Sequence, residues 1–170
     1  LKLRPTAPGN HVIKFNLGLI DIARGQNVEA VKKLTDIIKE YPNYFDARLA
    51  RAEANLQLNK ANEAVEDAEQ VLNKTDFEGV TPLLIERARF IRAAARYQLR
   101  FFNNAHADLR VILADNPKNT NAQILDALTL QQLGQPKEAL NQLNLIVSAN
   151  PQNTDALSTR AAVEAELKMY

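Results

Sequence analysis

The clearest signal for the fold lies in residues 120–153, which read TNAQILDALTLQQLGQPKEALNQLNLIVSANPQN. This stretch is rich in Leu and Gln, and it is interrupted at Gly134-Gln135 and again at Asn150-Pro151. Pro136 suits the first turn of a helix, where its missing N–H costs nothing. The stretch therefore predicts two helices, at 121–133 and 136–149, joined by a tight turn.

The same arrangement returns along the chain every 34 residues. Pro8 and Pro42 are 34 positions apart, and so are Pro117 and Pro151. Each column is broken once, after the second unit, by the same seven extra residues, and an offset shared by independent columns is hard to obtain by chance. The supporting columns are Gly18, Ala52, Ala93, Ala127 and Ala161; Ala30, Ala64, Ala105 and Ala139; and Ile37, Val71, Ile112 and Ile146.

These columns predict repeats at 11–44, 45–78, 79–119 and 120–153. In the first repeat we expect helices at 11–24 and 27–41, with the side chain of Asn27 capping the second. The seven extra residues belong to the third repeat, where Thr81 can cap and Pro82 can open a helix over 83–100. That helix is expected to be longer than its counterparts by about one turn at its start.

The two ends of the chain carry expectations of their own. Residues 1–10 are expected to be the remnant of a preceding repeat and its closing turn, as if the chain had been excised from a longer array. Residues 154–170 are expected to form a first helix without a partner, either a cap with a polar outer face or a truncated repeat.

Together the columns resemble the tetratricopeptide repeat, a 34-residue helix–turn–helix unit with small residues at positions 8 and 20 and proline at position 32. With His11 as position 1, the first unit matches at Gly18, Ala30 and Pro42. The resemblance implies an all-α fold, a right-handed α-solenoid of antiparallel helix pairs with about four repeats plus a terminal capping helix. The chain departs from the family at position 4, where a large aromatic residue is common and this sequence has Lys14, Arg48, Arg89 and Gln123.

Composition narrows the class of protein. The net charge is +1, which argues against a nucleic-acid binder, including an RNA-binding helical repeat, because such arrays are usually basic. No apolar run approaches the 18 or so residues that a membrane span needs, so no direct membrane insertion is expected. Cysteine is absent, so the compartment stays open between cytoplasm and periplasm.

No pattern of catalytic, cofactor-binding or metal-ligating residues stands out, so the sequence predicts a protein that is not an enzyme and has no cofactor. His11 and His106 are far apart, and no second histidine stands four residues from either, so a zinc site is unsupported. A stripe of arginines, at 89, 92, 96 and 100, is either a docking strip for an acidic partner or nucleic acid, or part of the packing. The low net charge favours the packing role.

In the resembled family the first helix of each repeat lines a concave groove, mainly through positions 2, 5, 9 and 12. Here positions 5, 9 and 12 are largely apolar, which favours a partner's amphipathic helix or extended apolar segment. The charged clamp that some relatives use for acidic chaperone tails is not expected, because Phe15 and Leu19 stand where it needs Lys and Asn. The predicted partner-binding residues are Phe15, Leu19, Ile22, Leu49, Glu53, Leu56, Arg87, Phe90, Tyr97, Ile124 and Leu128.

The sequence therefore predicts an adaptor or scaffold whose partner is a protein or peptide. The short Asn-Pro-x-Asn turns are typical of bacterial arrays, and such arrays often serve cell-envelope, exopolysaccharide or secretion assemblies. Two alternatives stay open. The chain is a regulatory or positioning domain of a longer enzyme, or it is a repeat module that self-associates into a homo-oligomer.

Overall fold

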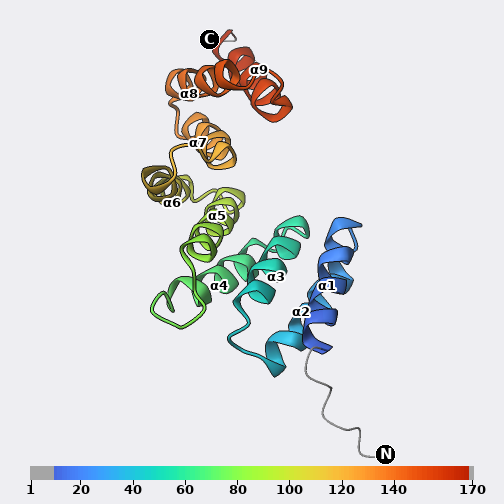
Figure 1. The fold of residues 1–170 in the computed structure, drawn as a ribbon. Coiled ribbons are helices and arrows are strands. Elements are labelled where there is room, and N and C mark those ends of the chain that lie inside the picture. The colour runs from blue at the N-terminus through green and yellow to red at the C-terminus, as the bar shows by residue number, and fades with distance from the viewer. Residues whose placement is uncertain (1–9, 169–170) are drawn as a thin grey trace, which may run out of the picture. The chain divides into compact units, whose positions relative to one another are not determined.

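A computed structural model describes residues 10–168, and within this range the chain is all-α (Figure 1). Short turns join the helices into antiparallel pairs, as the sequence predicted. Observed helix ends lie within a few residues of the predicted ones. The helices are α1 (Asn10–Ala23), α2 (Asn27–Glu40), α3 (Phe45–Gln57), α4 (Ala61–Leu72), α5 (Pro82–Gln98), α6 (Phe102–Asp115), α7 (Thr120–Gln132), α8 (Pro136–Ala149) and α9 (Thr154–Lys168).

The chain divides into two compact units, and the boundary falls inside α5, between Ile91 and Arg92. Each unit has an apolar core in which residues of a second helix pack between first helices. In the first unit the core joins α2 to α3 through Ala30, Leu34, Ile37, Ile38, Ala47, Ala50 and Ala54. In the second it joins α7, α8 and α9 through Ala127, Leu130, Ala139, Leu143, Ile146, Ala156 and Val163.

Small residues at position 8 allow the two helices of a pair to approach closely. Gly18 is buried in α1, and a Cβ atom added there would lie 3.2 Å from the side chain of Leu34 on α2. Ala52, Ala93 and Ala127 hold the same position in the later repeats and are completely buried. The column that revealed the repeat is therefore a contact between the two helices of each pair.

Every pair turns at position 15, where the backbone is left-handed. Gly25 and Gly134 have φ values of 72° and 77°, and Asn59 and Arg100 adopt 57° and 64° at the same position. Around Arg100 the N–H of Phe101 donates to the carbonyl of Arg96 and the N–H of Arg100 donates to that of Tyr97; the other three turns repeat this pattern. This is the Schellman arrangement, which satisfies the last carbonyls of a helix.

The links between pairs carry the proline column. Pro42, Pro117 and Pro151 each follow directly on the C-cap residue of a second helix, a place where a helix cannot continue. Two of the polar residues at position 4 contact these links. Arg48 Nε donates to the carbonyl of Pro42 at 3.0 Å, and Gln123 Nε2 donates to that of Pro117 at 2.8 Å. The departure from an aromatic residue at position 4 thus replaces ring packing with a hydrogen bond.

One sequence expectation needs correction. Asn27 does not cap α2, because it already lies inside the helix, and its buried Oδ1 has no hydrogen-bond partner among the described residues. The first helix of the third repeat is longer at its start by about one turn, as predicted: α5 has 17 residues against 13 in α3 and α7, and the remaining extra residues lengthen the link after α4. Thr81 caps α5 as predicted, its Oγ1 accepting from the N–H of Leu84 at 3.2 Å.

The structure describes the two predicted terminal segments to different extents. The predicted remnant at 1–10 lies outside the described residues except for Asn10, which begins α1. The predicted last helix is present as α9 up to Lys168, and it packs against α8 and α7.

Replacing Arg100 with glycine is expected to stabilise the protein. A non-glycine residue in the left-handed region costs about 1 kcal/mol, and glycine removes that cost. We expect the Arg100→Gly variant to unfold at a higher urea concentration than the wild type, followed by circular dichroism. The matched control is Gly134→Arg, which should lower the midpoint. Unchanged midpoints in both variants would show that position 15 is not strained.

Candidate partner-binding surfaces

The predicted groove residues of the first unit lie on α1, α3 and the first part of α5. On α1, Phe15, Leu19 and Ile22 are half-buried and pack against the core of that unit. Phe15 also stacks on Tyr44, with ring centroids 5.1 Å apart. These side chains therefore stabilise the fold and keep only part of their surface free. Leu56 and Phe90 are likewise half-buried, and the remaining predicted residues, Tyr97, Ile124 and Leu128, are half-buried in the second unit.

Leu49 is a correction to the predicted groove. Its side chain is completely buried, although it occupies the same repeat position as Phe15. A partner cannot reach it in this structure, and its role is packing. The physical reason is that α3 contacts α1 as well as α2 and α4, whereas the contacts of α1 among the described helices are with α2 and α3.

The two charged groove residues bind each other. Arg87 on α5 donates from Nε and Nη2 to the two carboxylate oxygens of Glu53 on α3, at 2.8 Å and 2.9 Å. These hydrogen bonds raise the pKa of Arg87; burial opposes the shift, and the charges of Glu53 and Asp46 add to it. A two-pronged pair of this kind fixes the spacing of α3 and α5, so it is a joint within the first unit.

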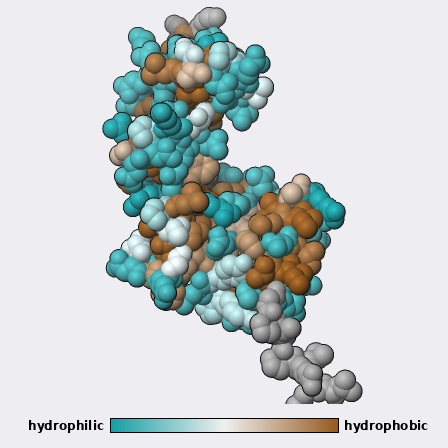
Figure 2. Space-filling view, viewed as in Figure 1, coloured by the Kyte–Doolittle hydropathy of each residue, from teal (hydrophilic) through white to brown (hydrophobic). Residues whose placement is uncertain are grey.

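An exposed apolar surface of the first unit was not among the residues predicted from the sequence. Ile13, Leu17 and Ile20 lie on one face of α1 and are 62%, 45% and 44% exposed. We call these three residues the outer row. Figure 2 shows the corresponding hydrophobic patch over α1. The signal was present in the sequence. Position 3 is alanine in every later repeat and position 10 is alanine, threonine or valine, whereas the first repeat has isoleucine at both positions.

The later first helices bury the face that the outer row exposes. Position 3 is a completely buried alanine in α3, α5, α7 and α9, and position 10 is completely buried in the same helices. In α3, α7 and α9 the first helix contacts the second helix of the preceding pair, which is α2, α6 and α8 respectively. The equivalent residues are Ala47, Ala88, Ala122 and Ala156 at position 3, and Ala54, Ala95, Thr129 and Val163 at position 10.

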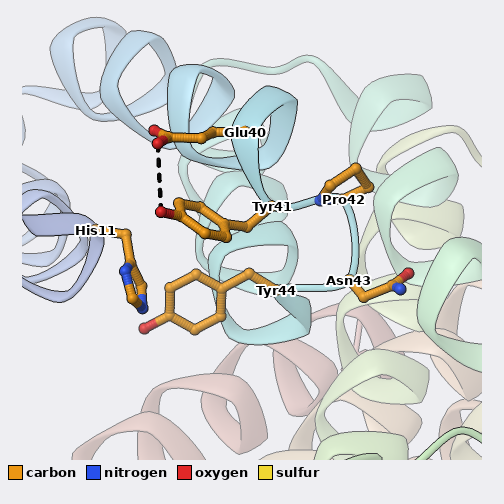
Figure 3. Close-up of a pocket in the computed structure, with 6 residues that line it drawn as sticks. All are labelled: His11, Glu40, Tyr41, Pro42, Asn43 and Tyr44. Carbon is orange, nitrogen blue, oxygen red and sulfur yellow. Dashed lines mark hydrogen bonds between the residues drawn. The ribbon is translucent and has the colours of Figure 1, made fainter. Parts of the chain in front are cut away.

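A second feature of the first unit is a pocket of about 400 Å³ at the start of α1 (Figure 3). His11 on α1 faces two tyrosines from the link between α2 and α3. Its ring centroid lies 4.6 Å from that of Tyr41 and 5.7 Å from that of Tyr44. Glu40 lies above, and its Oε1 accepts a hydrogen bond from the Tyr41 hydroxyl at 3.3 Å. Pro42 and Asn43 complete the lining.

The arginine stripe has the packing role at two of its positions. Arg92 donates from Nε and Nη2 to the carboxylate of Asp108 at 2.9 Å and 2.6 Å, and Arg96 Nη1 donates to it at 2.8 Å. In the second repeat Arg51 binds Asp67 in the same way, with both bonds at 2.7 Å. These pairs occupy repeat positions 7 and 23, so they are a recurring joint between the two helices of a pair.

The two histidines contact other protein groups. Nδ1 of His106 lies 2.6 Å from Oδ1 of buried Asp126, linking α6 to α7, and His11 belongs to the aromatic pocket. Among the described residues there is no group of three or more histidine, cysteine or acidic side chains placed to hold a metal ion. Nor does that part of the chain contain a helix long and apolar enough to cross a membrane.

Paired antiparallel helices with a fixed turn and recurring contacts define a helical-repeat protein. The family model of the tetratricopeptide repeat matches residues 14–44. The chain therefore has the tetratricopeptide repeat fold, with a recognisable repeat at those residues. A search of curated proteins found no match.

Solved structures of tetratricopeptide repeat proteins share this fold. One from Parabacteroides merdae is 22% identical in sequence, with a TM-score of 0.81. The match covers 97% of this chain and 62% of the Parabacteroides chain. A thermophilic protein from Thermus thermophilus is 17% identical with a TM-score of 0.77, covering 92% and 82%. The first such domain of human RPAP3 is 22% identical with a TM-score of 0.65, covering 75% and 95%. This chain thus spans less than two thirds of the Parabacteroides protein.

Removal of Asp108 is expected to destabilise the second unit strongly. The Asp108→Ala variant leaves two arginines, each about one-fifth exposed, without their carboxylate, and the expected loss is about 2–3 kcal/mol in the free energy of unfolding. The control is Glu164→Ala, which removes an exposed i,i+4 pair with Arg160 and should cost less than about 0.5 kcal/mol. Urea unfolding measures both, and equal losses would contradict the assignment of Asp108 as a structural joint.

Proposed function

We propose that this chain is a protein–protein interaction scaffold that binds an amphipathic helix of a partner protein on the outer row of α1. The single observation that carries the proposal is the exposure of Ile13, Leu17 and Ile20 on a face that the later first helices bury. Tetratricopeptide repeat proteins are generally scaffolds for protein binding, and exposed apolar patches commonly mark such interfaces.

A helix is the occupant that the internal contacts favour. In α3 the same face is covered by α2, and the contact buries Ala47 and Ala54 against Leu34 and Ile38. A partner helix on α1 would repeat that contact with the sizes exchanged, because α1 supplies the large residues. The partner is therefore expected to present an apolar row that includes small side chains, spaced three and four residues apart.

The charges on α1 favour acidic residues at the edges of the partner helix. Lys14 is half-exposed and Arg24, directly after α1, is exposed, whereas the acidic residue of α1, Asp21, is buried and forms an ion pair with Lys33. The accessible charge on α1 and at its end is thus positive. Complementary charges at the rim of an apolar interface speed association and help to set its register.

The predicted groove remains part of the proposal as a second contact surface. By helical periodicity Phe15, Leu19 and Ile22 lie on the side of α1 roughly opposite the outer row, so a second segment of the partner would contact their accessible parts. A bacterial cell-envelope, exopolysaccharide or secretion assembly is the setting we infer from the Asn-Pro-x-Asn turns. A regulatory domain of a longer enzyme would use the same surfaces.

Leu17→Glu is expected to abolish partner binding with little effect on the fold, because it places a charge in the centre of an exposed apolar interface. A partner captured on the wild-type chain would be purified and its affinity measured by isothermal titration calorimetry. We expect binding to the variant to be weaker by about tenfold or more.

The matched control is Leu145→Glu, which changes a residue that is 73% exposed on α8. It should bind the purified partner as the wild type does. Equal affinities of wild type and Leu17→Glu would reject the outer row, and a captured partner that proves to be the chain itself would support the self-association alternative instead.

A further inference from the structure

The pocket at the start of α1 combines aromatic faces with a carboxylate. Its volume of about 400 Å³ falls within the range of small-ligand sites. The His11 and Tyr44 rings meet edge to face, at an interplanar angle of 82°, and the Tyr41 ring is tilted by 40° from that of His11. Three rings in these orientations form walls that face different directions, as Figure 3 shows.

The electrostatics of these walls favour a positive ligand. The face of an aromatic ring carries partial negative charge and attracts ammonium and guanidinium groups within about 6 Å. Glu40 adds a full negative charge at the same place, and its carboxylate accepts from the Tyr41 hydroxyl. Burial and then the charge of Glu40 raise the pKa of Tyr41, so the carboxylate acts on that ring. A neutral apolar ligand would gain from neither effect.

The chain provides an internal comparison, because the second unit has a pocket at the same place in the repeat. This second pocket has a volume of about 320 Å³ and lies between the start of α7 and the end of α8. There Thr120 stands in place of His11, Ala149 in place of Glu40, and Asn150 in place of Tyr41. The hollow therefore belongs to the fold, whereas the rings and the carboxylate are specific to the first repeat.

A lysine of the chain lies near this pocket but is held by groups of its own. Lys74 Nζ donates to Oδ1 of Asn43 at 2.8 Å and lies 5.5 Å from the centroid of the Phe77 ring. Asn43 lines the pocket, so the ammonium group of Lys74 lies one hydrogen bond away from the pocket lining.

We propose that the pocket formed by His11, Tyr41, Tyr44 and Glu40 binds an organic cation. The shared chemistry is an ammonium or guanidinium group with apolar surface around it, which contacts the rings while Glu40 balances its charge. The cation is either a lysine or arginine side chain of a peptide or a small quaternary amine. The site is separate from the outer row and does not depend on the helix-binding proposal.

The decisive experiment compares two ligands that differ by one charge. Choline and 3,3-dimethylbutan-1-ol have nearly the same shape, but only choline is a cation. Each is titrated into the full chain while NMR follows the ring signals of Tyr41 and Tyr44, with Tyr97 as the internal control. We expect choline to cause saturable shifts at Tyr41 and Tyr44 and to bind about tenfold more tightly than the alcohol. Equal affinity for the two, or shifts at Tyr97 alone, would overturn the proposal.

A blocked arginine, N-acetyl-arginine amide, separates the two sources of the cation. Tighter binding of blocked arginine than of choline supports a peptide side chain, and the reverse order supports a small quaternary amine. The absence of saturable binding by both probes would reject the site.

Two substitutions test the named groups without entering the core. Glu40 is exposed, so Glu40→Gln should leave the rings in place. This variant should bind choline several-fold more weakly than the wild type and bind the alcohol with unchanged affinity. Tyr41 is also exposed, so Tyr41→Leu should abolish the preference for choline over the alcohol. Tyr97→Leu, in the other unit, serves as the control. Wild-type choline affinity in both Glu40→Gln and Tyr41→Leu would overturn the assignment of these groups.

Discussion

Close packing between a first helix and the preceding second helix depends on small side chains at two positions of the repeat. In α3, Ala47 and Ala54 are completely buried against the apolar residues of α2, and the same holds at these positions through α9. A larger residue there would push the helices apart, because protein interiors have little free volume. α1 is the exception, since it holds Ile13 and Ile20 at these positions and exposes both. The binding surface that we propose follows from this one departure.

Within each pair a different set of contacts fixes the geometry. The left-handed residue at position 15 reverses the chain, and ion pairs such as Arg51 with Asp67 and Arg92 with Asp108 then join the two helices. Arg92 and Arg96, which belong to the arginine stripe of the sequence, are thereby used to join the helices of a pair. The pairing of Arg87 with Glu53 extends the same principle to neighbouring first helices. Charge on the surface of this protein is thus a poor guide to binding, and unpartnered apolar and aromatic groups are a better one.

The first repeat differs from the others in both of its candidate binding surfaces. It exposes isoleucine at positions 3 and 10, where later repeats have buried alanine, threonine or valine, and it lines a shared hollow with rings where the fourth repeat has Thr120 and Asn150. In a repeat protein such differences are informative, because the other repeats show what the fold alone requires. A scaffold can in this way keep one architecture and place its specificity in a single repeat.

The sequence alone determined the all-α class, the 34-residue interval and the helix ends to within a few residues, because these depend on local spacing and on residues such as Pro42 and Gly134. It did not determine which groove positions stay accessible: Leu49 and Phe15 share a repeat position, yet only Leu49 is completely enclosed. Nor did it reveal the left-handed turns at Asn59 and Arg100, where the backbone hydrogen bonds of the Schellman arrangement form without glycine. The aromatic pocket also required the tertiary structure, because it brings His11 beside Tyr41 and Tyr44 from the far end of the repeat. Accessibility and proximity are properties of the packed helices, and a linear pattern cannot specify them.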